Sequence, residues 1–187
     1  MRFVLKWIKW IKFCISSVKF SVLINGTTTR FFGAQRGLRQ NDPLSLFLFL
    51  LVMEGFNNML KTSNTNGWLR GFDVANDGRE SIEVTYLQYA GDIPIFCGVE
   101  EEQFKYLRVI LILFEGISGL HISWRKNFLY PINKVHNMEA LNLILGGQVG
   151  ALPTTYIGML LGAKSMTKVI WSSVIEKCEK KLTEWKG

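Results

Sequence analysis

The sequence predicts an α+β fold, because strand-like and helix-like segments are mixed along the chain without the regular alternation of a doubly wound sheet. Stretches in which apolar and polar residues alternate, as in half-buried strands, lie between stretches whose apolar residues recur at helical spacing. The 187 residues include 13 Phe, 6 Trp and 5 Tyr, more aromatic side chains than a disordered chain carries. A chain of this length suits one domain or a large part of one.

The first predicted helix covers residues 3–17 and has two unlike faces. Lys6, Lys9 and Lys12 share one side, at 100° per residue. The other side is apolar and consists of Phe3, Val4, Trp7, Ile8, Ile11 and Cys14. Because the lysines interrupt every apolar stretch, the segment is not a signal peptide. Such a helix can pack on a core or lie on a membrane surface; we favour packing and expect no membrane partner, because most charged stripes are solvated faces.

A hairpin and a long apolar helix follow. Residues 19–25 alternate and end at Asn25-Gly26, so we expect a turn there and a returning strand over residues 27–34. Asp42 and Pro43 then begin a helix, because Asp caps free N–H groups and Pro suits the first helical position. Its apolar spacing continues to Leu60, and we expect it to be the most buried helix. Its apolar run of ten residues is too short for a membrane span, which needs about 20.

The remaining elements are shorter. Residues 61–67 are polar and predict a loop, and short strands are expected around residues 68–74. A second hairpin is predicted from strands at 82–89 and 93–97 with its tip at 90–92.

A helix over 100–117, ended by Gly119, has one apolar face: Phe104, Leu107, Ile110, Leu111 and Phe114. Further strands are predicted over 120–123, 127–131 and 155–161, a short helix over 135–145 and a final amphipathic helix over 165–186.

Charge and metal-binding residue types limit the function. The chain has 22 Lys and Arg against 15 acidic residues, a net charge of +7 that permits an anionic partner such as nucleic acid. The three cysteines and two histidines are isolated from one another, so we expect neither a disulfide framework nor a zinc site.

Two segments carry residues suited to chemistry. Arg36, Arg39 and Gln40 lie just before the N-terminus of the long helix, where free N–H groups and the helix dipole favour a phosphate. Tyr89-Ala-Gly-Asp92 lies at the tip of the second hairpin, and on its own it is a turn.

Taken with residues 20–26 and 118–126, these two segments resemble the reverse transcriptase domain of LINE-type (non-LTR) retrotransposons, and its plant members most. Residues 154–163 and 174–182 extend the resemblance over nearly the whole chain in the family's order. The resemblance implies a partial right-hand polymerase palm of antiparallel strands backed by helices over residues 1–163. Residues 164–187 would begin the thumb, and the fingers and first palm strand would be missing.

The family reaction joins a primer 3′-hydroxyl to a deoxynucleotide (dNTP) on an RNA template, with two Mg²⁺ ions stabilising the attacking and leaving oxygens. The resemblance therefore implies an RNA template, a DNA primer and dNTP as partners, Mg²⁺ as cofactor and the nucleus as compartment. The sequence leaves the oligomeric state open.

The resemblance also assigns roles to residues. Asp92 matches the second carboxylate of the motif C hairpin, a metal ligand and catalytic residue, whereas Gly91 replaces the first. Lys126 matches a basic catalytic residue beside the leaving pyrophosphate. Nucleic-acid and substrate contacts are implied for Arg36, Arg39, Gln40, Tyr89, Tyr156 and Gly158. Three positions depart from the family's usual residues: Asn41 for Gly, Leu46 for Pro and Leu160 for Pro.

One remaining aspartate cannot hold two Mg²⁺ ions, which need several converging oxygen ligands. We therefore expect an inactive, truncated copy of a reverse transcriptase domain. The alternative is a non-catalytic remnant that binds RNA or DNA through its cationic side chains, with a salt-dependent affinity.

Overall fold

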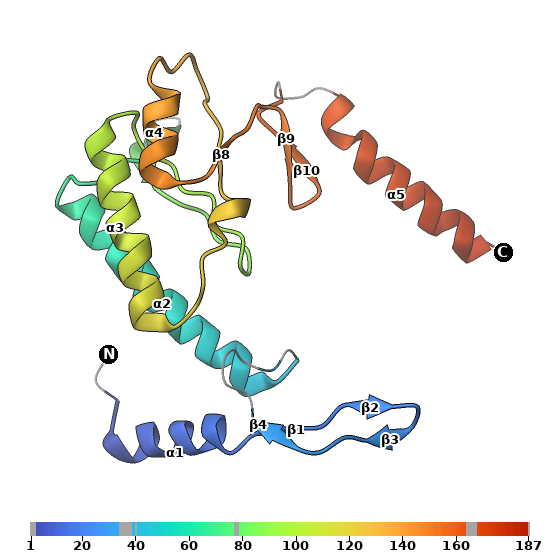
Figure 1. The fold of residues 1–187 in the computed structure, drawn as a ribbon. Coiled ribbons are helices and arrows are strands. Elements are labelled where there is room, and N and C mark those ends of the chain that lie inside the picture. The colour runs from blue at the N-terminus through green and yellow to red at the C-terminus, as the bar shows by residue number, and fades with distance from the viewer. Residues whose placement is uncertain (1–2, 34–38, 40, 77–78, 164–167, 187) are drawn as a thin grey trace. The chain divides into compact units, whose positions relative to one another are not determined.

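A computed structural model describes residues 3–33, 39, 41–76, 79–163 and 168–186, and Figure 1 shows its elements in chain order. The chain divides into two compact units, residues 1–57 and 58–187, with the boundary inside one helix. We describe each unit by itself. Both combine helices with short strand pairs, and every sheet in the described ranges has two strands.

The first unit begins with helix α1 (Leu5–Ser16), within the range that the sequence predicts, and none of its residues is buried. The predicted hairpin at Asn25-Gly26 is confirmed. Strands β2 (Leu23–Ile24) and β3 (Thr27–Thr28) pair antiparallel across a two-residue turn. Asn25 and Gly26 have φ values of 48° and 81°, as the favoured hairpin turn requires. Farther from the turn, β1 (Lys19–Phe20) pairs with β4 (Phe32–Gly33).

Helix α2 (Pro43–Thr65) starts where the sequence predicts. The carboxylate of Asp42 accepts a hydrogen bond from the Leu44 N–H at 2.9 Å, which is the expected cap. The helix runs beyond Leu60, so the prediction of a loop over 61–67 is wrong for its first five residues. The hydroxyls of Thr62, Ser63 and Thr65 donate to carbonyl oxygens four residues earlier, and so their polar groups are satisfied within the helix.

The prediction that α2 is the most buried helix is also wrong. Met53, Phe56 and Leu60 are buried, but Leu46, Phe47 and Leu50 near its start are each about half exposed or more. Its 23 residues include an 18-residue window with mean hydropathy 1.4, so length and composition alone would allow a membrane crossing. Core helices of soluble proteins pass the same test, so we assign no span.

The hairpin strands of the second unit differ from the prediction. Strand β5 (Phe72–Asn76) pairs with β6 (Arg79–Val84), so residues 82–84 of the predicted strand 82–89 belong to this hairpin rather than the next one. Between residues 86 and 95 the chain forms only isolated bridges, Tyr86 with Ile95 and Tyr89 with Asp92. The predicted tip at 90–92 therefore exists, but without regular strands on either side.

Two further strand pairs follow. β7 (Phe128–Leu129) pairs with β8 (Gln148–Val149) in parallel, although the resemblance implies antiparallel strands. The prediction of one strand over 155–161 is wrong, because Ile157 and Gly158 form a turn there and divide it into an antiparallel hairpin of β9 (Thr154–Tyr156) and β10 (Met159–Leu161). Residues 120–123, which the structure describes, do not form the predicted strand. A 3₁₀ turn, η1 (Trp124–Lys126), comes directly after them.

The core of the second unit forms around helix α3 (Glu101–Ser118). Its predicted apolar face is confirmed, because all five of its residues are buried: Phe104, Leu107, Ile110, Leu111 and Phe114. Helix α4 (Met138–Leu145) packs against α3 and buries Leu141 and Leu145. Helix α5 (Lys168–Lys186) closes the chain and contacts β10.

We expect Leu107→Ala to lower the free energy of unfolding by about 2–5 kcal/mol, because it removes a buried side chain and leaves a cavity. Leu107 is 4% exposed, whereas Ile112 on the same helix is 48% exposed and serves as the matched control. Urea unfolding followed by circular dichroism measures both variants. Equal losses for Leu107→Ala and Ile112→Ala would contradict this assignment of the buried face.

Candidate functional site

The hairpin tip that carries Asp92 is held by backbone hydrogen bonds. The N–H of Tyr89 donates to the Asp92 carbonyl at 3.0 Å, and the N–H of Asp92 donates to the Tyr89 carbonyl at 2.9 Å. The two-residue loop is Ala90-Gly91, and it is Ala90, not Gly91, that adopts the left-handed conformation, with φ of 50°. A non-glycine residue there costs free energy, on the order of 1 kcal/mol or more, which the surrounding hydrogen bonds offset.

Space is open at Gly91, the position where the family carries its first carboxylate. A Cβ atom built there meets no heavy atom within 4 Å, and the φ of Gly91 does not require glycine. The backbone would therefore accept an aspartate at position 91 without strain or collision.

Tyr156 lies beside this hairpin. Its hydroxyl donates to the backbone carbonyl of Asp92 at 3.4 Å, although the two residues are 64 positions apart in the chain. Partial burial, and secondarily the Asp92 carboxylate, raise the pKa of the Tyr156 phenol above its ordinary value. Tyr156 ends β9, and the turn after it uses Ile157 and Gly158, both with positive φ.

Lys126 lies in η1 and its side chain is exposed. Glu115 on α3 holds the segment before it: the Glu115 carboxylate accepts hydrogen bonds from the Ile122 N–H at 2.7 Å and the Trp124 indole N–H at 3.3 Å. These bonds, the backbone one first, lower the pKa of Glu115. Within the described residues no ion pair joins Lys126 to Asp92, so these two predicted catalytic residues do not contact each other.

Arg108 supports the same turn from the other side. Its Nη1 donates to the carbonyls of Ile144 at 2.9 Å and Leu145 at 2.8 Å, at the C-terminal end of α4. Its guanidinium also lies 5.2 Å from the centroid of the Trp124 ring. The position of η1 therefore depends on α3 and α4 together.

The predicted phosphate-binding segment is described only in part. Arg36 and Gln40 lie outside the described residues, and Arg39 is exposed. Asn41 has φ of 63°, a conformation that favours glycine and that asparagine tolerates better than most residues. The resemblance expects Gly at this position.

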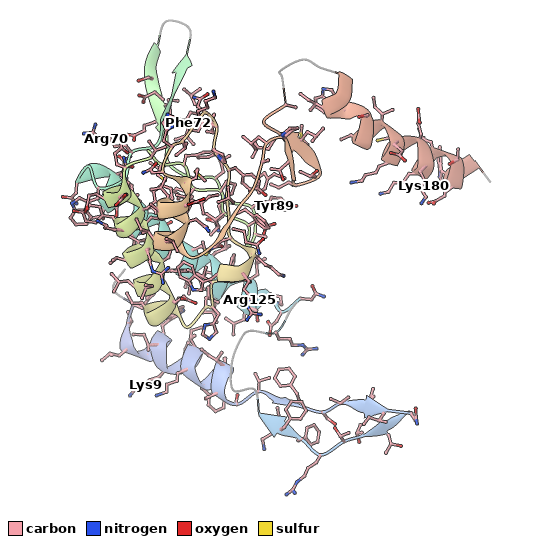
Figure 2. The ribbon with its side chains drawn as sticks, turned by 45° about the horizontal axis from the view of Figure 1, so that its top comes forward. Lys9, Arg70, Phe72, Tyr89, Arg125 and Lys180 are labelled. Atoms are coloured by element: carbon pink, nitrogen blue, oxygen red, sulfur yellow. The ribbon has the colours of Figure 1, made fainter. Side chains whose placement is uncertain are left out.

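A groove between the turn of the β9–β10 hairpin and α5 was missed by the sequence interpretation. Its charged lining consists of three lysines and one acid, beside Ile157 and Gly158 of the turn: Lys177, Lys180, Lys181 and Glu184. Figure 2 labels Lys180 among the side chains that extend from α5. The lysine spacing of three and four places these charges on one helix face, a signal that the sequence contained.

The residues present do not fit a two-magnesium site. Nowhere in the described parts of the chain do three His, Cys, Asp or Glu side chains come together as a possible metal site. Burial, and secondarily Glu100, raise the pKa of Cys97 to about 11, so this thiol is neutral and a poor metal ligand near pH 7. We therefore derive no reaction step through a metal ion.

We expect the Glu115→Gln variant to lose less stability on acidification than the parent chain. Because the folded state lowers the pKa of Glu115, its contribution is present above the ordinary value of about 4.3 and is lost as the pH falls through the lowered value. Glutamine keeps an acceptor oxygen for Ile122 but not the charge.

Urea unfolding midpoints between about pH 7 and pH 3 measure this difference. An unaltered pH dependence for Glu115→Gln would show that the Glu115 charge does not stabilise the 120–126 segment.

Comparison with known proteins gives one distant relative in a plant. The chain is 36% identical over 70 residues to a protein of Arabidopsis thaliana described as an uncharacterized mitochondrial protein. The match covers 37% of this chain and 55% of that protein, so the chain spans about half the length of this relative. No protein-family model matches the chain, and no solved structure matches it. The chain thus has similarity to a plant protein.

Proposed function

We propose that this chain is part of a reverse transcriptase domain of the LINE type that no longer catalyses nucleotidyl transfer. The family reaction is RNA-directed DNA synthesis. In this chain the proposed remaining activity is the binding of an RNA–DNA duplex through cationic side chains.

The observation that carries the proposal is the contact between Tyr156 and the Asp92 hairpin. The resemblance assigns Asp92 to the catalytic hairpin and Tyr156 to the segment that grips the primer, two regions that a polymerase brings together at the primer terminus. The hydrogen bond between these two residues, 64 positions apart in the chain, supports the proposal because the resemblance expects the two regions to lie side by side.

The loss of catalysis follows from the carboxylates. Asp92 is exposed at the hairpin tip, and its neighbour in the family pair is Gly91. A single carboxylate leaves most of the coordination shell of two Mg²⁺ ions unfilled. Residues that act as a catalytic unit fail together when one member is removed, so the rate loss should be several orders of magnitude.

Duplex binding is favoured by the groove beside the same turn. Lys177, Lys180 and Lys181 face the Ile157-Gly158 turn, which follows directly on Tyr156. Lysines at this spacing suit successive phosphates, because each can neutralise one charge and release a counterion. The similarity to a plant protein is consistent with the plant character of the resemblance.

Primer extension tests the catalytic part. With Mg²⁺ or Mn²⁺, an RNA template and a DNA primer, we expect no incorporation by the chain or by its Gly91→Asp variant, because two carboxylates from one hairpin tip fall short of the ligand set that two ions need. Gly91→Asp is a fair test because the position is open. Circular dichroism checks folding, and an active reverse transcriptase is the positive control.

Incorporation by the unaltered chain would mean that other carboxylates hold the metal ions and that the chain is an active enzyme. Incorporation by Gly91→Asp alone would mean that one substitution accounts for the whole loss of activity.

Filter binding with an RNA–DNA duplex tests the binding part. Replacing Lys177, Lys180 and Lys181 by Gln should weaken binding and should reduce the slope of log affinity against log salt by about three, roughly one for each phosphate that is no longer neutralised. The matched control replaces Lys61, Lys105 and Lys134, three exposed lysines outside the groove, by Gln. Equal losses in both triple variants would indicate nonspecific attraction by net charge rather than binding in the groove.

A further inference from the structure

The positive charge of the chain is concentrated at one end. Residues 1–41 contain eight of the 22 cationic residues and none of the 15 acidic ones. The remaining 146 residues hold 14 cationic and 15 acidic side chains, so their net charge is −1. The whole excess of positive charge therefore belongs to the segment that contains α1 and the first hairpin.

Helix α1 carries an apolar face that the described residues of its unit do not bury. None of the residues Leu5–Ser16 is buried, and Trp10 is 61% exposed. Ile8 and Ile15 are each 44% exposed, and Phe3, just before the helix, stacks on Trp7 with ring centroids 4.3 Å apart.

The charged side chains of α1 all lie on one face, which also carries the exposed Leu5 and Phe13. At 100° per residue, the apolar face spans roughly 160° and contains Trp7, Ile8, Trp10, Ile11 and Ile15. Lys6, Lys9 and Lys12 all lie on the opposite face, where Figure 2 shows the side chain of Lys9 extending outward. The Lys6 ammonium lies 5.0 Å from the Trp10 ring centroid, at the border of the two faces. Lysines at such a border can reach an anionic surface while their stems cover apolar area.

Another helix of the chain lacks this combination. Helix α5 has lysines too, but it also carries Glu176, Glu179 and Glu184, so it does not pair an apolar face with lysines alone. α1 contains no acid at all, and two tryptophans lie on its apolar side. Tryptophan is enriched where an apolar interior meets water, since its ring is apolar and its N–H is polar.

We propose that α1 binds the surface of an anionic lipid membrane and lies in the interface with its Trp and Ile face inserted and its lysines at the headgroups. Nucleic acid would use the lysines but leaves the broad apolar face without a role. A lipid bilayer accounts for both faces at once, because burial of apolar area and attraction to anionic headgroups add together. This inference uses residues outside the proposed duplex groove and does not depend on the proposed function.

Vesicle flotation with the full chain tests the proposal. We expect the chain to float with phosphatidylcholine vesicles that contain about 30 mol% phosphatidylserine and to float far less with pure phosphatidylcholine, with binding that weakens as salt is raised. Replacing Lys6, Lys9 and Lys12 by Gln should lower the partition coefficient roughly 100-fold, since each lysine near an anionic surface contributes about a factor of five.

Two further variants separate the contributions. The first variant replaces Ile8, Ile11 and Ile15 by Ser. It keeps every charge but has less apolar area on α1, and it should also lose flotation. The second variant replaces Lys177, Lys180 and Lys181 by Gln. It loses the same amount of charge as the α1 lysine variant, but it should float like the parent chain. Circular dichroism of the full chain checks that each variant keeps its helix content.

Several outcomes overturn the proposal. These are equal binding to neutral and anionic vesicles, no flotation of the folded parent chain, and equal losses in the α1 and α5 lysine variants. In a fourth outcome, the α1 lysine variant floats like the parent chain but no longer binds the RNA–DNA duplex. This result would assign the three lysines to nucleic-acid binding. Absence of duplex binding by the parent chain would contradict the proposed function and leave the membrane result standing.

Discussion

The arrangement of the second unit depends on the guanidinium of Arg108. It donates to the last two carbonyl oxygens of α4 and lies over the Trp124 ring, so that one side chain joins α3, α4 and η1. A cation is stabilised there because the carbonyls at a helix C-terminus are unpaired and carry partial negative charge. Glu115, two turns farther along α3, binds the same segment through Ile122 and Trp124. Opposite charges on one helix thus fix the chain that leads to Lys126.

Under the proposed function, the hairpin at Asp92 keeps its fold without its chemistry. Its tip is closed by backbone hydrogen bonds between Tyr89 and Asp92, which need no particular side chain at position 91. A carboxylate at 91 would point into open space and would contribute little to packing. Under the proposed function, glycine at this position removes a metal ligand without removing a structural contact, so stability exerts no pressure to restore the carboxylate. Architecture and reaction are separate properties of this site.

The two proposed binding surfaces use lysine in different ways. In the groove beside Gly158, the α5 lysines stand near a turn and present charge to a partner that is itself charged. On α1, the lysines oppose a face of exposed aromatic and aliphatic side chains, so charge and apolar area act on the same partner. The same residue type therefore suits a phosphate backbone in one place and a lipid surface in the other, and its neighbours decide which.

The sequence by itself determined the local elements. Asn25-Gly26 specifies a hairpin turn, Asp42-Pro43 a helix start and Gly119 a helix end, because each depends on conformational preferences and hydrogen bonds within a few residues. The buried face of α3 was predictable for the same reason, since spacing fixes which side chains share a side.

Only the tertiary structure decided the partners of those elements. Three examples are the pairing of β5 with β6, the parallel pairing of β7 with β8 and the hydrogen bond between Tyr156 and Asp92. The spacing of residues along the chain does not encode any of these contacts. The extension of α2 beyond Leu60 also depended on tertiary packing, because Leu60 and Ser63 are buried near its C-terminal end. Periodicity specifies a face, but the energy of burying that face exists only once a second surface is in place.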